Sequence, residues 1–452
     1  MKIVIAGAGT IGLNLATKLS YEGHDLFLID NDRNKLRSAE EGLDVKTIVG
    51  EAASIEVLRQ ANAEDAHLLI AVTRSDAVNI LVCQLAARLG TKKRIARIRH
   101  SGCFQDPSVI IPYDLDIDMV IYPEGEVAKE IWQLLHRPFA IEVSTFFNDQ
   151  IEVIGLHITE NSILEAKTLT ELKELSRHPF TIVGIVRDSN GIVPVAWDGV
   201  LKAEDKIYLS AISTDINEIV EDFGFETKKI SNVFIYGGDT VGFNLAKRLE
   251  NTKVQARILE PCRNRIHELA YELKKVLVLH GEGTDSSLLE GEGIEEADVF
   301  VAVTDDEEAN LLSCILAKKK GAVKTISLVT KPDYIPLIAD LGVDAVISKR
   351  LTTLNRIMQF VIRGEVVSVS DISEGEISAI EFRITKNTIV SGMEIGSEEF
   401  NDIFPDTAII GGLQLETGQV SVPEEGTVLN VGDRVIVYVP ASAVREVEKI
   451  FV

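Results

Sequence analysis

Long hydrophobic runs are missing from this chain of 452 residues. Its apolar stretches, such as HLLIAV at 67–72 and VIVYV at 435–439, are much shorter than the ~20 residues that span a bilayer. The first residues, MKIVIAGAG, lead directly into a glycine pattern and show no secretory segment with a cleavage site. We therefore expect a cytosolic protein.

Basic residues are few compared with acidic ones. The chain has 46 Lys and Arg against 70 Asp and Glu, which gives a formal net charge of −24. A nucleic acid backbone would repel such a chain, and the sequence lacks the basic stripe that nucleic-acid readers carry. This composition argues against a nucleic acid partner.

Cysteine and histidine do not form the sets that metal binding or catalysis requires. The four cysteines, Cys83, Cys103, Cys262 and Cys314, show no CxxC spacing, which favours reduced thiols over disulfides or a zinc framework. The eight histidines form no HxxxH or HExxH motif, and no GxSxG motif occurs. We therefore predict no metal site and no catalytic residue.

The chain does contain a repeat of its own sequence. Residues 5–20, IAGAGTIGLNLATKLS, match residues 235–250, IYGGDTVGFNLAKRLE, at eight of sixteen positions. Residues 66–86 match residues 297–317 at nine of twenty-one positions, and Cys83 aligns with Cys314 where an amphipathic helix would bury it. The sequence therefore indicates a tandem duplication.

A weaker repeat shows that the duplicated unit has two parts. Residues 179–209 resemble residues 406–437, and both run from a strand through a turn and a proline-containing strand to a loop with Asp before a closing strand. The four predicted domains span 1–140, 141–227, 228–363 and 364–452.

The two larger units alternate short apolar strands with helical stretches. This alternation predicts an α/β fold, in which each larger unit is a Rossmann-like, doubly wound parallel sheet covered by helices on both faces. The smaller units have short strands and little helix, so each is expected to be a small α+β domain. In the first copy the expected strands are 2–6, 25–30, 45–49, 67–72, 94–98 and 117–121, and the helices begin near residues 10, 32, 54 and 76.

A helix is also expected at 123–138, between the first two domains. Its apolar residues Val127, Ile131, Leu134 and Leu135 recur at helical spacing. This stripe has two interpretations: it packs on its own domain, or it pairs with another subunit.

The first glycine motif fits GxGxxG and lies between an expected strand and an expected helix. The first glycine allows a tight turn, the second lets a pyrophosphate approach the backbone, and the third lets the helix pack closely on the strand. The helix N-terminus then offers free N–H groups to the phosphates. The motif consists of Gly7, Ala8, Gly9, Thr10, Ile11 and Gly12.

Asp30 ends the second strand, eighteen residues after Gly12. An acid at this position accepts hydrogen bonds from the adenosine ribose and repels a 2′-phosphate, which favours NAD(H) or an adenine mononucleotide over NADP. The alternative is an empty Rossmann fold in which Asp30 caps a helix.

Further polar residues follow the fourth and fifth strands. Thr73 and Arg74 end the fourth strand, at the sheet edge where ligands bind. Arg97 and Arg99 end the fifth strand, and the alternation of side chains puts both on one side. Arg97 is a candidate phosphate ligand, although surface ion pairs remain an alternative for both arginines.

The second glycine motif departs from the pattern. Asp239 stands where the second glycine is expected, and its carboxylate would repel a pyrophosphate. Glu260 replaces Asp30, and the strand at 325–330 has no arginine. We therefore expect this site to bind dinucleotide weakly, to bind another ligand or to be structural. The motif consists of Gly237, Gly238, Asp239, Thr240, Val241 and Gly242.

Taken together, these segments resemble the TrkA family of potassium-uptake regulators. The resemblance rests on GAGTIG after a strand, Asp30, IAVTRSDAVN, RIARIR and a small domain with IVGIVR, all repeated once along the chain. The larger units resemble TrkA-N domains, also called RCK or KTN domains, and the smaller units resemble TrkA-C domains.

This resemblance implies a non-catalytic nucleotide sensor. It implies NAD(H) as ligand, with ATP or ADP at the same site in some members. It also implies a membrane partner, the potassium-translocating subunit of the TrkH or TrkG type, and a homo-oligomer from a dimer to a tetrameric ring on the cytosolic face. Carried over by position, the first site comprises Gly7 to Ile11, Asp30, Thr73, Arg74 and Arg97, and the second comprises Gly237 to Val241, Glu260, Thr304 and Asp305.

Two other functions are compatible with a dinucleotide site. An NAD-dependent oxidoreductase would need a general acid or base beside the nicotinamide, and the small domains offer no convincing set. A soluble redox sensor acting on transcription is weakened by the acidic charge and by the lack of a recognisable helix-turn-helix segment.

Overall fold

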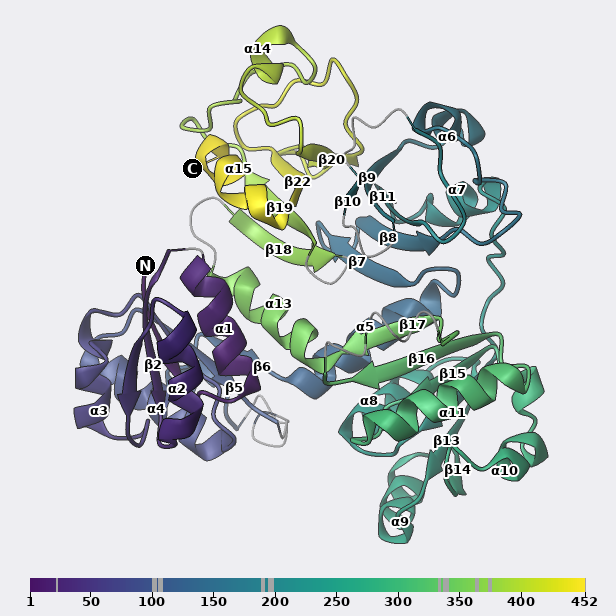
Figure 1. Cartoon of the computed structure of the whole chain (residues 1–452), viewed down its shortest axis with the longest axis horizontal. Helices are drawn as coiled ribbons and strands as arrows, with labels where there is room; N and C mark the ends of the chain where they lie inside the picture. Colours follow the sequence, from purple (N-terminus) through teal and green to yellow (C-terminus); the bar gives the residue numbers. More distant parts are fainter. Residues whose placement is uncertain are drawn as a thin grey trace. The chain divides into compact units, whose positions relative to one another are not determined.

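The computed structural model describes residues 1–21, 23–99, 104, 109–187, 192–193, 199–331, 335, 341–361, 366–372 and 376–451. The chain forms two compact units (Figure 1). Unit 1 comprises Met1–Val127 and Ser348–Val361, and unit 2 comprises Ala128–Ile347 and Ile362–Val452.

Unit 1 is built on a six-stranded parallel sheet in the order β3-β2-β1-β4-β5-β6. This order and the predicted parallel sheet are typical of a Rossmann fold. The predicted strands agree with the observed ones within two residues. The strands are β1 (Lys2–Ala6), β2 (Asp25–Asp30), β3 (Lys46–Val49), β4 (Leu68–Ala71), β5 (Lys93–Arg97) and β6 (Met119–Ile121), and the helices between them are α1 (Thr10–Tyr21), α2 (Arg33–Gly42), α3 (Ile55–Gln60) and α4 (Asp76–Leu89).

Both faces of this sheet are buried because successive strand residues point to opposite sides. Ile3 and Ile5 of β1 belong to one core cluster, with Leu15 and Leu19 of α1. Val4 and Ala6 of β1 belong to the other cluster, which contains residues of α3 and α4. The near-continuous apolar strands of the sequence therefore reflect helices on both faces.

A helix from the second repeat completes unit 1. Helix α13 (Lys349–Val361) packs on α1, and four of its apolar side chains belong to the same core cluster as Ile3 and Leu15. Burial of one such side chain contributes about 1.5–3 kcal/mol. The four residues are Leu354, Ile357, Met358 and Val361.

Unit 2 contains the second six-stranded sheet, in the equivalent order β14-β13-β12-β15-β16-β17. The prediction of a duplicated Rossmann-like domain is therefore confirmed. The strands are β12 (Asn232–Tyr236), β13 (Gln255–Glu260), β14 (Leu277–His280), β15 (Val299–Ala302), β16 (Lys324–Val329) and β17 (Ala345–Ser348), and the helices are α8 (Thr240–Leu249), α9 (Arg263–Glu272), α10 (Ser286–Gly291) and α11 (Glu307–Lys319).

The two small domains of unit 2 each contain a five-stranded antiparallel sheet, in the matching orders β10-β9-β11-β8-β7 and β21-β20-β22-β19-β18. The first has β7 (Glu142–Phe146), β8 (Ile151–His157), α6 (Leu169–Leu175), β9 (Phe180–Val186), β10 (Ile192–Val193), β11 (Lys206–Ile212) and α7 (Ile216–Asp222). The second has β18 (Val366–Ile372), β19 (Ile377–Arg383), α14 (Glu398–Asn401), β20 (Ile409–Gln414), β21 (Val420–Ser421), β22 (Arg434–Pro440) and α15 (Val444–Phe451).

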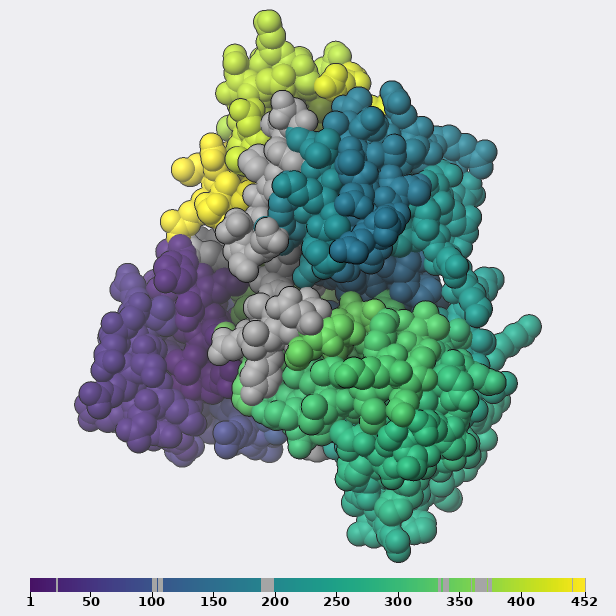
Figure 2. Space-filling model, turned by 45° about the vertical axis from the view of Figure 1, so that its right-hand side comes forward, coloured from purple at the N-terminus to yellow at the C-terminus, as the bar shows by residue number. Residues whose placement is uncertain are grey.

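These two small domains, blue and yellow-green, lie side by side (Figures 1 and 2). One core cluster joins them, with Phe146 and Tyr208 from the first and Ile436 from the second. Inside this contact the buried Ser210 hydroxyl donates to the Gly411 carbonyl oxygen at 2.9 Å, and it also lies 2.9 Å from the Tyr438 hydroxyl. The small domains therefore form a paired core within one chain.

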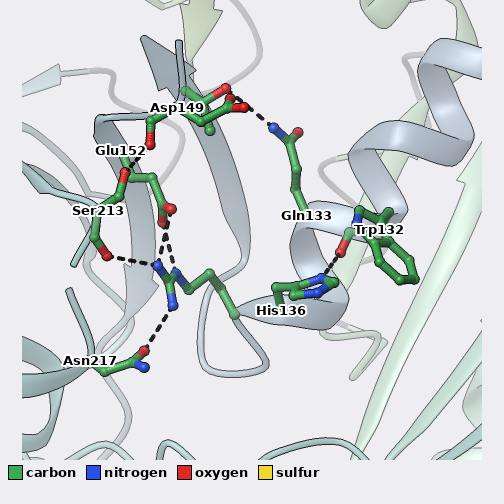
Figure 3. A network of polar contacts seen from close by, with 9 residues as sticks. Trp132, Gln133, His136, Asp149, Glu152, Ser213 and Asn217 are labelled. Carbon is green, nitrogen blue, oxygen red and sulfur yellow. Dashed lines mark hydrogen bonds and ion pairs between the residues drawn. The ribbon is translucent and has the colours of Figure 1, made fainter. Parts of the chain in front are cut away.

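The predicted helix between the first two domains is α5 (Pro123–His136), and its stripe of Val127, Ile131, Leu134 and Leu135 is buried. Arg137 directly follows it and forms a network of hydrogen bonds with the first small domain (Figure 3). Its guanidinium donates to both carboxylate oxygens of Glu152 and also bonds the Asn217 side chain and the Ser213 carbonyl. This network fixes the end of α5.

Three of the four cysteines are free thiols, as the sequence predicts. Cys83 and Cys314 are fully buried at equivalent positions of α4 and α11, and burial raises the pKa of the Cys83 thiol to about 12. Cys103 lies outside the described residues. Within the described ranges, no helix is long and apolar enough to cross a bilayer.

Candidate functional site

The first glycine loop connects β1 to α1, and the structure gives each glycine a separate role. Gly7 has φ +111°, and a Cβ there would come within 3.0 Å of the Thr73 backbone nitrogen. A Cβ on Gly12 would lie 1.8 Å from the Gly7 carbonyl oxygen, so only glycine lets α1 start this close to the loop. A Cβ on Gly9 would meet nothing within 4 Å, which leaves the space above the loop open.

Asp30 supports this loop from below. Its Oδ2 accepts a hydrogen bond from the Ala8 backbone N–H at 2.7 Å, and its Oδ1 accepts bonds from the Asp32 N–H at 2.9 Å and from Lys35 Nζ at 3.3 Å. Burial opposes ionisation of Asp30, but these hydrogen bonds outweigh it and hold the pKa of the carboxyl below its ordinary value. Asp30 is therefore ionised and holds the glycine loop in place through its hydrogen bond with the Ala8 N–H.

The capping interpretation of Asp30 is wrong. Asp32, two residues later, is the N-cap of α2, and its side chain accepts from the Asn34 N–H. A carboxylate has about four lone-pair sites, so Asp30 keeps acceptor capacity for the hydroxyls of a ribose.

A cavity of about 360 Å³ opens over the glycine loop. Three basic side chains from three elements surround it: Lys35 of α2, Arg74 after β4 and Arg350 of α13. The free N–H groups at the start of α1 add positive partial charge. The cavity is lined by Ala8, Gly9, Thr10, Leu13, Asn14, Lys35, Arg74 and Arg350.

The structure brings four of the predicted residues to the cavity wall: Ala8, Gly9, Thr10 and Arg74. Gly7, Gly12 and Asp30 shape the loop beneath it, and Ile11 packs against the core. Leu13, Asn14, Lys35 and Arg350 also line the cavity but were not predicted. Lys35 had a sequence signal, since the equivalent residue of the second repeat, Arg265, is also basic.

Thr73 and Arg97 do not line the cavity. The Thr73 hydroxyl donates to Asn79 Oδ1 at 2.6 Å, and the Asn79 amide donates to the Arg97 carbonyl at 2.8 Å. This clamp joins the ends of β4 and β5 to α4. Burial, followed by the charge of Arg99, lowers the pKa of Arg97, and within the described part of the chain its Nε has no hydrogen-bond acceptor.

The second glycine loop keeps the same frame. Gly237 has φ +106°, and a Cβ on Gly242 would lie 1.9 Å from the Gly237 carbonyl oxygen. Glu260 accepts hydrogen bonds from the backbone N–H groups of Gly238 and Cys262, both at 2.7 Å. Glu260 is therefore the structural equivalent of Asp30.

The polar residues around the second loop differ in charge from those of the first. Asp239, at the start of α8, and Asp305 occupy the positions of Gly9 and Arg74. Arg265 bonds the Gly238 carbonyl at 2.9 Å and the Glu268 carboxylate at 2.7 Å. A phosphate placed at this loop would therefore meet two acidic residues in place of a glycine and an arginine. Of the remaining predicted residues, Thr240 begins α8, Val241 is buried, and the Thr304 hydroxyl repeats the clamp by donating to Asn310 Oδ1 at 2.7 Å.

The fold and the loops define a protein with two Rossmann-type domains, of which the first has an open cavity lined by three basic residues. The family model of the TrkA-N domain matches residues 3–123 and 233–349, and that of the TrkA-C domain matches residues 379–452. The chain therefore belongs to the TrkA family.

Relatives extend over the full length of the chain. The chain is 33% identical to the Trk system potassium uptake protein TrkA of Halomonas elongata, covering 100% of this chain and 98% of the relative. It is also 33% identical to the protein of the same name from Haemophilus influenzae, again covering 100% and 98%.

Solved structures share the fold. A crystal structure of the GsuK RCK domain is 16% identical, with a TM-score of 0.60, and the match covers 99% of this chain and 94% of that one. The GsuK channel bound to NAD is also 16% identical, with a TM-score of 0.60, covering 99% of this chain and 78% of that one.

Proposed function

We propose that this chain is the nucleotide-binding regulatory subunit of a Trk-type potassium uptake system and controls potassium flux through a membrane partner. The full-length relatives named for potassium uptake support the biological role. The observation that carries the nucleotide part is the cavity over the first glycine loop, which three basic side chains surround.

The ligand of this cavity is NAD(H), with ATP or ADP as competitors for the same site. An ionised Asp30 favours a free ribose over a 2′-phosphate. The GsuK channel, which shares the fold, has been solved with NAD. Gly7 to Gly12 and Asp30 would hold the adenosine and pyrophosphate, while Arg74 and Lys35 would neutralise phosphate charge. Arg97 remains a candidate phosphate ligand from the sequence.

The second glycine loop binds dinucleotide less tightly than the first. Asp239 and Asp305 place carboxylates where the first loop has a glycine and an arginine. We also propose that the chain has the four domains assigned from the sequence, 1–140, 141–227, 228–363 and 364–452. Helix α13 is the part of the third domain that packs in unit 1.

The protein acts without chemical turnover, at the cytoplasmic face of the membrane. It attaches through a TrkH- or TrkG-type subunit and assembles as a homo-oligomer, from a dimer to a tetrameric ring. A net charge of −24 suits the basic cytoplasmic loops of a membrane protein better than anionic lipid. A nucleotide shifts such an assembly only if it binds two of its conformations with different affinity.

Potassium uptake by cells that lack this chain tests the proposal. We expect wild-type protein to restore nucleotide-responsive uptake and to bind NADH in calorimetry, whereas Lys35→Ala weakens both. Arg37→Ala is the control, because Arg37 lies on the same helix in an exposed pair with Glu41. Absence of NADH and ADP binding, or uptake that ignores removal of the chain, contradicts the proposal. Turnover of NAD with candidate substrates would instead favour the oxidoreductase.

A further inference from the structure

The wall of the first cavity includes a residue from the other repeat. Arg350 is the second residue of α13 and lies 336 positions from Asn14, to whose side-chain oxygen it donates a hydrogen bond. Both residues line the cavity over the glycine loop. Arg350 therefore belongs to the first loop in space although it belongs to the second repeat in sequence.

Packing holds α13 within unit 1. Its apolar residues, including Leu354 and Ile357, are buried in the core cluster that also contains Leu15. Next to Arg350, Lys349 forms an ion pair with Glu124, on the first turn of α5, at 2.7 Å. The start of α13 is thus held by the Lys349–Glu124 pair and its later residues by the core, with Arg350 lining the cavity.

The charge at this position is reversed between the repeats. Helices α5 and α13 follow the last strand of their respective sheets. The second residue is Glu124 in α5 and Arg350 in α13. The first loop also has the open Gly9 and the basic Arg74, whereas the second has Asp239 and Asp305. The basic residue at the start of α13 therefore lies at the first glycine loop, whose other residues also suit an anion.

We propose that Arg350 is a phosphate ligand of the first nucleotide site, supplied by the second repeat. Its guanidinium would exchange the Asn14 oxygen for phosphate oxygens, with which it forms charge-assisted and bidentate hydrogen bonds. The proposal rests on nucleotide binding at this cavity. A nucleotide bound at the first loop would then form hydrogen bonds directly with a residue of α13. This helix begins where β17 of the second sheet ends.

Calorimetry on the full-length protein tests this role, with NADH and ADP as probes. We expect Arg350→Ala to raise the Kd of both probes about tenfold and Arg350→Lys to raise it less, because lysine keeps the charge but not the bidentate geometry. The matched control is Arg356→Ala. Arg356 lies on the same helix, pairs with Glu126 at 3.5 Å and does not line the cavity, so its loss should leave both values unchanged.

Each outcome decides the role of Arg350. A loss of nucleotide affinity in the Arg350 variants, with unchanged affinity in Arg356→Ala, supports the role of Arg350 as a phosphate ligand. Wild-type affinity in Arg350→Ala, or equal loss in Arg350→Ala and Arg356→Ala, overturns it, since the second result assigns the effect to packing of α13. If wild-type protein binds neither NADH nor ADP, the proposed function itself fails and the role of Arg350 fails with it.

Discussion

At the residue scale, the acids below the two glycine loops have a structural task that precedes any contact with ligand. Asp30 and Glu260 each accept a loop N–H at 2.7 Å and a second N–H two residues beyond themselves. The side chain of Glu260 is one methylene longer than that of Asp30, and it accepts from backbone N–H groups at equivalent positions. A loop N–H without such a partner would be a buried donor left unsatisfied, which costs about 1–3 kcal/mol.

Asp30→Ala should therefore lower both nucleotide affinity and stability. We expect the Kd for NADH to rise about tenfold and the Tm to fall, because the Ala8 N–H loses its acceptor. Asp32→Ala is the control: it removes the cap of α2 at a cost of about 1 kcal/mol but leaves the loop braced. Equal NADH affinities in the two variants would contradict the role of Asp30. Calorimetry and thermal unfolding measure these effects.

Lys324 is a buried lysine at the start of β16. Its Nζ donates to the Ala140 carbonyl oxygen at 2.5 Å, in the segment between α5 and β7. Burial lowers its pKa to about 7, while the nearby Asp344 acts in the opposite direction and Lys318 adds to the lowering. Folding therefore favours the neutral amine.

This lysine should make stability depend on pH. Between about pH 7 and the ordinary lysine pKa of 10.5, the unfolded chain binds a proton that the folded chain does not. Stability should thus rise with pH across this window, by up to about 1.4 kcal/mol per pH unit. Lys324→Met should raise the Tm most at pH 7, with a gain that shrinks towards pH 10. The exposed Lys253→Met is the control, and parallel Tm profiles for the two variants would contradict this account.

At the scale of elements, the two glycine loops share the same backbone conformation, but the charges of the residues around them differ in sign. A side chain at Gly9 meets open space, whereas one at Gly12 meets the backbone of Gly7. A side chain at the first position would therefore change the space in which we propose that the nucleotide binds, whereas one at the second would change how α1 joins β1.

Substitutions at these two glycines should separate binding from folding. Gly9→Asp, which copies Asp239, should leave the Tm nearly unchanged and raise the Kd for NADH about a hundredfold through repulsion of phosphate. Gly12→Ala should lower the Tm, because α1 must move away from the loop. Retained NADH affinity in Gly9→Asp would show that a carboxylate is tolerated at the cavity. Calorimetric stoichiometry on wild-type protein should give one tight NADH site per chain.

The elements also show how far the sequence predicts this structure. The strands and helices of the first Rossmann domain were predicted because apolar runs and turn residues are local signals. The position of α13 was not predicted, since its apolar stripe says only that one face is buried and not which core covers it. Arg350 and Asn14 had no local signal for their contact across 336 residues. Ligand contacts of Arg97 and Thr304 remain predictions.

At the scale of the whole molecule, α5 is followed by Arg137, whose network of hydrogen bonds holds the end of the helix on the first small domain within unit 2. The side chains of Arg137 and Glu152 are only 16% and 12% exposed, so each would be a poorly solvated charge without the other. Removal of one partner from such a pair costs about 3 kcal/mol or more. The network therefore stiffens the end of α5 in unit 2.

Arg137→Ala should loosen this junction. We expect faster amide exchange in β8 and α7 and a lower Tm, because Glu152, Asn217 and Ser213 lose a common donor. Arg177→Ala is the control, since Arg177 forms an exposed pair with Glu218 in the same domain, where ion pairs contribute ~0–1 kcal/mol. Equal exchange rates in the two variants would contradict a role for the network. Hydrogen exchange measured by mass spectrometry distinguishes them.

The contact through Ser210 and Tyr438 has an evolutionary consequence. Two separate identical subunits meet through a symmetric interface, where every mutation appears twice. Covalent fusion removes this constraint and supplies each half with its counterpart at a fixed local concentration. The halves are then free to differ, so one loop can carry Gly9 while the other carries Asp239.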